Sequence, residues 1–301
     1  MAAWLVVLTA AEVVGFVALT RFFVQTVHGQ RLDWIALTGN EIGHRTVEGP
    51  VNTALNTISV VSLVVATVVV VFIAVIRRRI AVAVLSVLLI AGANISSELL
   101  KLVLDRPSLG VDTARAAAGN SLPSGHTTVA ASVAVALVLA LPTRVRGVGA
   151  LIGTIVTAFV GIATLSAGWH RPSDAVGSVL LVGAWAGVAG LLLLFVQPRD
   201  APPPAVRHKN YLSTVLLALA GVALVAVAVV ALYLTDQVAA VHPTDLSRHR
   251  LLAAYGGAAA GIGGATALMM AAFLVTLHRI VPPRVQAGDE VEPETVDLAV
   301  G

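Results

Sequence analysis

The sequence predicts an all-α integral membrane protein. Of its 301 residues 57% are hydrophobic and only 12% are charged, which is about half the charged share of an ordinary soluble domain. The mean hydropathy is +0.92. Apolar runs long enough to cross the hydrocarbon core, about 20 residues each, recur along the chain. Because these runs are continuous and do not alternate with polar residues, we expect helices and not barrel strands.

Eight membrane-spanning helices are predicted. Most of the spans are free of charge, whereas the first contains Glu12 and Arg21. The first span also lacks the small-residue cleavage site of a signal peptide, and we expect it to be retained as a helix. The predicted spans lie near residues 3–24, 57–76, 80–104, 124–141, 148–168, 174–196, 212–234 and 251–278.

Charge and cysteine content argue against several other classes of protein. The basic residues are scattered singly between apolar runs and the net charge is only +3, so no nucleic-acid-binding surface is expected. The chain has no cysteine, which excludes disulfides and thiolate metal sites. Its polar segments are too short for a separate soluble domain.

The distribution of Lys and Arg predicts the orientation in the membrane. Three arginines, Arg77 to Arg79, fill one very short connection, and short basic connections favour the cytoplasmic side. We therefore expect a multi-pass protein of the plasma (inner) membrane with both termini in the cytoplasm. The longer outer segments would then be residues 25–56, 105–123, 169–173 and 235–250.

The chain is expected to have four parts. A transmembrane core, a Pro-rich cytoplasmic connection, a hairpin of two transmembrane helices and a disordered acidic tail are predicted at 1–197, 198–211, 212–278 and 279–301. In the last helix, Gly257 and Gly261 have a spacing that lets helices approach closely. Packing within the chain is the simpler interpretation, and a homodimer interface is the alternative.

Three polar groups occur at the expected outer ends of spans, where polar residues are costly and therefore informative. The third span ends with Asn94, Glu98, Lys101 and Asp105 on one helical face, followed by Arg106-Pro107. The fourth span opens with the stretch from Asn120 to His126. The sixth opens with the stretch from Trp169 to Asp174.

The residues of these groups suit phosphate chemistry. Ser124 and Gly125 stand at a helix start, where free backbone N–H groups and the helix dipole favour an anion. His126 can exchange a proton in the same turn. His170 and Asp174 are four residues apart, so that the carboxylate can fix the imidazole tautomer and raise its basicity. Lys101 can supply a compact positive charge to phosphate.

Each group also has a simpler structural interpretation when it is taken alone. Ser124 and Asp174 could cap helices, the two histidines could lie at the water interface, and Lys101 could extend along the helix end to the membrane surface. A metal pair at His170 and Asp174 is a weaker alternative because no third ligand has a matching spacing. The joint occurrence of all three groups at one membrane depth favours a site.

These motifs resemble those of the type-2 phosphatidic acid phosphatase family, whose fold is shared with vanadium haloperoxidases. The resemblance covers roughly residues 55–197 and rests on Lys101 with Arg106-Pro107, on Pro123-Ser124-Gly125-His126 and on His170-x-x-x-Asp174. It implies a six-helix phosphatase-type transmembrane core, to which this chain adds two further C-terminal transmembrane helices.

The sequence departs from the family pattern at two arginines. In the family, Arg-Pro follows the lysine after six residues, whereas here Arg106-Pro107 arrives two positions early and Ser108-Leu109 occupies the family position. The Ser-Arg pair of the third motif is replaced by Ala163-Thr164. A threonine hydroxyl supplies no charge, and the loss of one charged donor costs about 10²–10³ in rate. Arg106 or Arg171 could compensate.

The resemblance implies a metal-independent lipid phosphatase without a cofactor. His170 would be the nucleophile, Asp174 would orient it, and His126 would act as acid and then as base. The phosphate-binding residues would be Lys101, Ser124, Gly125, Arg106, Thr164 and Arg171. The substrate would be a phosphate of a polyprenyl carrier or phospholipid. The alternatives are a non-hydrolytic lipid-phosphate binding or transport protein and a lipid phosphoryl transferase.

Overall fold

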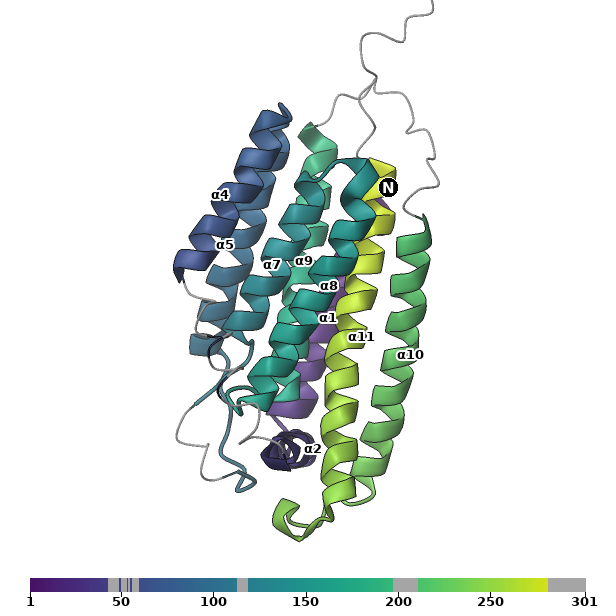
Figure 1. Ribbon diagram of the computed structural model, residues 1–301. Coiled ribbons are helices and arrows are strands. Elements are labelled where there is room, and N and C mark those ends of the chain that lie inside the picture. The colour runs from purple at the N-terminus through teal and green to yellow at the C-terminus, as the bar shows by residue number, and fades with distance from the viewer. Residues whose placement is uncertain are drawn as a thin grey trace, which may run out of the picture.

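The computed structural model describes residues 1–42, 49, 53, 55, 60–112, 119–196 and 211–280. Within these residues the protein is all-α, and its long helices run side by side in one bundle (Figure 1). The predicted fold class is therefore confirmed. The long helices are α1 (Ala2–Leu19, continued by the π-helical turn Thr20–Val24), α4 (Val60–Ile76), α5 (Ile80–Val103), α7 (Gly125–Ala140), α8 (Thr143–Ser166), α9 (Pro172–Val196), α10 (Tyr211–Asp236) and α11 (Arg248–Ile280).

Six of these helices are long and apolar enough to cross a membrane, whereas α7 and the apolar part of α4, Ser62–Ile76, are shorter. The 16 residues of α7 extend over only about 24 Å at 1.5 Å per residue, less than the ~30 Å hydrocarbon core. Helix α7 is enclosed by α4, α5, α8 and α9. Its polar outer end is therefore surrounded by protein and not by lipid, which makes a short helix tolerable there.

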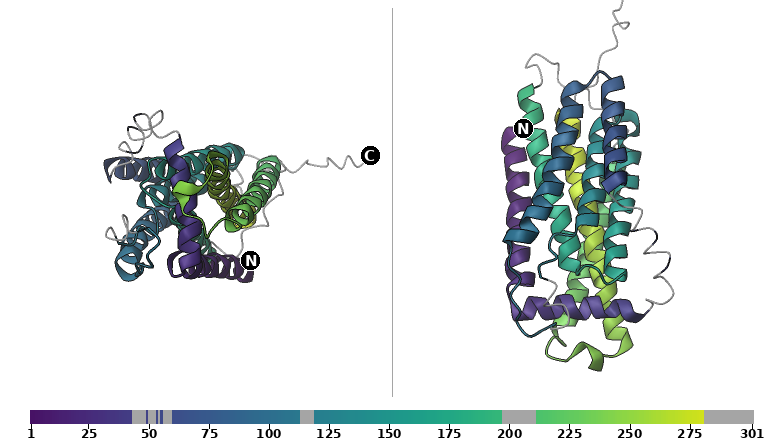
Figure 2. Two further views of the ribbon diagram at one scale, coloured as in Figure 1. Left: turned by 90° about the horizontal axis from the view of Figure 1, so that it is seen from below. Right: turned by 90° about the vertical axis from the view of Figure 1, so that its left-hand side faces the viewer.

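A short helix, α2 (Val27–Thr38), lies across one end of the bundle (Figures 1 and 2). The sequence prediction treated this stretch only as part of an outer segment. Thr26 caps the helix, since its hydroxyl accepts a hydrogen bond from the Gly29 N–H at 2.9 Å. One face of α2 packs on α11 through Ile35 and Ala36 against Leu251 and Ala254. The short helix is thereby fixed over the end of the bundle.

The two C-terminal helices differ in their surroundings. Helix α11 packs against α8 and α9, and its buried residues Met270, Leu274 and Leu277 belong to the main hydrophobic core. Helix α10 lies at the edge of the bundle beside α11 (Figure 1). Residues 198–210 of the predicted Pro-rich connection and residues 281–301 of the predicted tail lie outside the described part of the chain.

Small residues allow α10 and α11 to approach each other closely. A Cβ atom added at Gly264 would lie 2.9 Å from the Val225 backbone nitrogen and 3.1 Å from the Gly221 carbonyl oxygen. A Cβ atom at Gly257 would meet the Ala231 Cβ at 2.1 Å. Gly257 therefore packs within the chain, against α10.

We expect Gly264→Ala to destabilise the protein, because the added methyl group meets backbone atoms that cannot move without separating the two helices. Overpacking of this kind costs about 1–3 kcal/mol. The matched control is Gly256→Ala in the same helix, where an added Cβ meets nothing within 4 Å. Thermal unfolding in detergent compares the two variants. Equal melting temperatures would contradict the close contact between α10 and α11.

Candidate active site

The starts of α7 and α9 are joined by hydrogen bonds at the end of the bundle over which α2 lies. The Ser124 N–H donates to the Asp174 carbonyl oxygen at 3.0 Å. The Ser178 hydroxyl contacts both segments, at 2.8 Å from the Ser124 carbonyl oxygen and 2.9 Å from that of Asp174. Two of the three polar groups of the sequence are thereby brought into direct contact.

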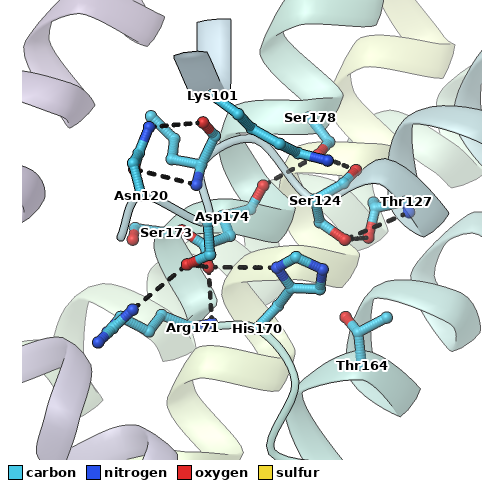
Figure 3. Close-up of polar contacts among 12 residues, drawn as sticks. Lys101, Asn120, Ser124, Thr127, Thr164, His170, Arg171, Ser173, Asp174 and Ser178 are labelled. Carbon is cyan, nitrogen blue, oxygen red and sulfur yellow. Dashed lines mark hydrogen bonds and ion pairs between the residues drawn. The ribbon is translucent and has the colours of Figure 1, made fainter. Parts of the chain in front are cut away.

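His170 and Asp174 form a pair at the start of α9. The His170 Nδ1 atom lies 3.4 Å from the Asp174 Oδ2 atom. The same carboxylate oxygen accepts hydrogen bonds from the Ser121 hydroxyl at 2.6 Å and from the Arg171 N–H at 3.0 Å. Asp174 is fully buried. Figure 3 shows the opposite edge of the His170 ring pointing away from Asp174, toward the side where Ser124 and Thr127 lie.

His126 lies in the first turn of α7, next to the same site. Its ring centre is 5.4 Å from that of Trp169, the residue that precedes His170. His170 and Lys101 are both close enough to His126 to interact with it electrostatically. The structure therefore brings together the two histidines and the lysine of the three predicted groups.

Lys101 lies over the start of α7. Its Nζ atom is 2.8 Å from the Glu98 Oε1 atom, and a Cβ atom added at Gly125 would be 3.3 Å from Nζ. The Ser124 hydroxyl caps the helix by accepting hydrogen bonds from the Thr127 N–H at 3.4 Å and the Thr127 hydroxyl at 3.1 Å. An ammonium group and the positive end of a helix thus lie together, an arrangement that favours an anion.

Arg106 is close enough to Asp174 to interact with it electrostatically and is paired with Asp33 of α2. The Arg106 Nη2 atom is 3.6 Å from the Asp33 Oδ2 atom. Asp33 is buried and accepts hydrogen bonds from the Ser173 N–H at 3.3 Å and from the Ser173 hydroxyl. Burial raises the pKa of Asp33 to about 6, against the opposing charge of Arg106. Burial and the charge of Arg171 lower the pKa of Arg106.

Arg171, like Arg106, is held by neighbouring side chains. Its Nη1 atom donates to the Ser121 hydroxyl at 3.3 Å, and its Nη2 atom is 3.4 Å from the Asp112 Oδ2 atom. The two arginines expected to help bind phosphate are therefore both paired with carboxylates in this structure.

Thr164 stands at the position of the second family arginine, and its hydroxyl is hydrogen-bonded within its own helix. The hydroxyl donates to the Gly161 carbonyl oxygen of its own helix at 2.8 Å. The Thr164 carbonyl oxygen accepts hydrogen bonds from the backbone N–H groups of Trp169 at 3.0 Å and His170 at 3.2 Å. Thr164 thus fixes the backbone that carries His170.

Several polar residues of this site, including Ser178 and Asp112, were missed by sequence reasoning. Ser121 and Ser173 fall within the two motif stretches but carry no signal of their own. Asp33 lies outside every motif. The one sequence signal for it is that an acidic residue stands between the apolar residues Leu32 and Ile35. Among the described residues, no group of three or more His, Cys, Asp or Glu could hold a metal ion.

Comparison with known proteins agrees with the motifs. Residues 81–201 match the model of the PAP2 superfamily, so that α1, α2, α4, α10 and α11 lie outside the matched segment. No curated protein and no solved structure matches the chain. The resemblance drawn from the motifs is confirmed by the family match, and phosphatase activity on phosphate esters is the activity that it indicates. This match over residues 81–201 is consistent with a member of the type-2 phosphatidic acid phosphatase family.

Proposed function

We propose that this protein is a membrane lipid phosphate phosphatase that works through a phosphohistidine intermediate. Its substrate is a phosphomonoester or diphosphate of a polyprenyl carrier or a phospholipid. The observation that carries the proposal is the pairing of His170 Nδ1 with the buried Asp174 carboxylate. The opposite edge of the ring points away from Asp174 (Figure 3), and His126 is close enough to His170 to interact with it electrostatically. Binding of a headgroup needs cations, but it does not need an imidazole oriented by a carboxylate.

In the first step, the His170 Nε2 lone pair attacks phosphorus and a P–N bond forms. The bond from phosphorus to the lipid oxygen breaks, and its electron pair leaves with that oxygen. Protonated His126 gives its proton to the leaving oxygen. Asp174 holds the Nδ1–H of His170 and stabilises the positive charge that develops on the ring.

In the second step, neutral His126 removes a proton from water, and the water oxygen attacks the phosphoryl group. The P–N bond breaks and its electron pair returns to His170 Nε2. The products are inorganic phosphate and protonated His126, which is the state that begins the next cycle. A group that acts first as acid and then as base needs a pKa near the working pH, as a histidine has.

The phosphoryl oxygens are held by fixed charge and backbone dipoles. Lys101, the Ser124 hydroxyl and the N–H groups at the start of α7 converge at one place, and such groups stabilise the charge that spreads over these oxygens. The proposed reaction uses no metal ion. Thr164 is uncharged, and Arg106 and Arg171 are paired with carboxylates that are almost fully covered by protein. Lys101 is paired with Glu98, whose side chain is exposed, so that Lys101 can exchange this partner for a phosphate and supply the main positive charge.

The position of the site at one end of a bundle of apolar helices suits a substrate whose phosphate lies in the headgroup layer. Its hydrocarbon tail would then remain in the lipid. We assign this end to the extracytoplasmic side of the inner membrane because the opposite end carries Arg77 to Arg79. The preference for a polyprenyl carrier rests on analogy with the family.

A non-hydrolytic lipid-phosphate binding or transport protein is the second candidate. The observation that favours it is Thr164, whose hydroxyl is bound within its own helix where the family has a charged arginine. Such a protein would bind a lipid phosphate without releasing phosphate, and His170→Ala would bind it as well as the wild type does. A phosphoryl transferase would instead depend on an added lipid or sugar hydroxyl.

The proposed function predicts that the purified protein releases inorganic phosphate from a panel of lipid phosphates in the presence of a chelator. His170→Ala and His126→Ala should each lower this release by at least about 10³-fold, because single members of such catalytic units carry effects of that size. His249→Ala, a change at an exposed histidine on the same end of the bundle, is the matched control. Undiminished phosphate release in His170→Ala would exclude the covalent route.

Removal of the Lys101 charge should lower kcat/KM by about 10²–10³-fold, the effect of deleting one group that stabilises transition-state charge. Lys101→Met keeps most of the side-chain volume and removes the cation. The control is Arg248→Gln, which removes an exposed cation at the same end of the bundle. Equal effects of the two substitutions on kcat/KM would show that Lys101 acts only through general surface charge.

A further inference from the structure

Asp33 connects a helix outside the matched family segment to the candidate active site. It lies on α2, while the family match covers residues 81–201. Asp33 accepts two hydrogen bonds from Ser173, the neighbour of Asp174 in the first turn of α9. It is also the carboxylate paired with Arg106. Asp33 therefore contacts both the backbone that carries Asp174 and a buried cation close to Asp174.

Two complementary atoms in this cluster have no hydrogen-bond partner among the described residues. They are Arg106 Nη1, a donor, and Asp174 Oδ1, an acceptor, and both are buried. The two side chains are close enough to interact electrostatically. A buried polar atom without a partner costs about 1–3 kcal/mol, so a direct Arg106–Asp174 bond would be favourable if Arg106 were free to form it.

Such a bond would compete with His170 for the same carboxylate. An arginine can hold a carboxylate with two parallel charge-assisted hydrogen bonds, whereas the His170 Nδ1 atom lies at a long 3.4 Å from Asp174. Together with Arg171 and Gln30, Arg106 lines a small cavity of about 20 Å³, which has room for about one water molecule. The ion pair with Asp33 holds Arg106 in its present place.

We propose that Asp33 is a positioning residue for the His170–Asp174 pair: by holding the Arg106 guanidinium, it keeps that group from pairing with Asp174 and leaves Asp174 to His170. The inference rests on the proposed function, because it takes this pair as the part of the site that performs the reaction.

The charges around Asp33 support this role at neutral pH. Arg106 faces it from the segment after α5, Arg171 from the segment before α9, and Asp174 from α9 itself. Arg171 is occupied by Asp112 and Ser121. Burial raises the pKa of Asp33 to about 6, so that its carboxylate is still mostly ionised at pH 7.5 and can hold Arg106 there.

The test uses the full chain in lipid nanodiscs at pH 7.5, with ¹⁵N-labelled histidine and the His170 signals assigned through His170→Ala. Asp33→Asn keeps the shape of the side chain and removes its charge. We expect it to shift the His170 Nδ1 signal toward its position in Asp174→Asn. The double variant Asp33→Asn/Arg106→Gln should restore the wild-type position, because the competing cation is gone. A role limited to the Ser173 contact would give no such rescue.

Asp236→Asn is the matched control. Asp236 is a carboxylate on α10 that pairs with His28 of the same helix α2, at 2.6 Å. Its substitution makes the same chemical change and also removes a contact of α2. It should alter the His28 signal and leave that of His170 in place.

The kinetic readout concerns kcat and KM separately. Asp33→Asn should lower kcat roughly 10- to 100-fold, the cost of a misplaced catalytic group, and change KM little because Asp33 does not touch the substrate. The double variant should return to the kcat of Arg106→Gln alone. If the wild type releases no phosphate, the proposed function fails, and the His170 signals still decide the role of Asp33.

An unchanged His170 signal in Asp33→Asn, or a shift that persists in the double variant, would overturn the proposal. If Asp33→Asn does not fold but the double variant does, the coupling between Asp33 and Arg106 is supported. If neither folds, Asp33 is a structural cap of α9 and the positioning role is excluded.

Discussion

The main-chain hydrogen bond from Ser124 to Asp174 is the interaction on which the candidate site depends. It joins the first turns of α7 and α9, where both residues are buried and their backbone groups must find partners within the protein. The Ser178 hydroxyl contacts the carbonyl oxygens of both Ser124 and Asp174 and thereby fixes both helix starts. The start of α7, which we propose binds phosphate, and the His170–Asp174 pair of α9 are therefore held at a set distance from each other.

The departures from the family pattern change how positive charge is arranged around the hydrogen-bonded starts of α7 and α9. Where the family has an arginine, Thr164 uses its carbonyl oxygen to hold the backbone of His170. Arg106 is paired with Asp33, and Arg171 is paired with Asp112. These arginines contact residues at or next to the first turn of α9, and in the proposed function the direct contact with an anion is left to Lys101 and the start of α7. A site built in this way depends on residues beyond the family motifs, and Asp33 is the clearest example.

The long helices and the three polar groups could be predicted from the sequence. Continuous apolar runs, and polar residues whose placement in a membrane costs free energy, can be recognised from the local sequence alone. The position of Lys101 near the start of α7 and the pairing of His170 with Asp174 agree with these predictions. Helix α2 and the role of Asp33 could not be predicted, since a short helix lying across the bundle has no long apolar run and its partners are distant in sequence. The burial of α11 in the core was equally hidden, because small apolar residues such as Gly264 suit both lipid and protein surroundings.

The central claim is that His170 becomes covalently phosphorylated. The most direct measurement is mass spectrometry of His126→Ala after reaction with phenyl phosphate and an alkaline quench that preserves phosphohistidine. Phenolate leaves without an acid, whereas breakdown of the intermediate needs His126 as base, so a phosphoryl group should accumulate. We expect one phosphoryl group per chain, located on His170. Absence of the modification, or its location on another residue, would contradict it.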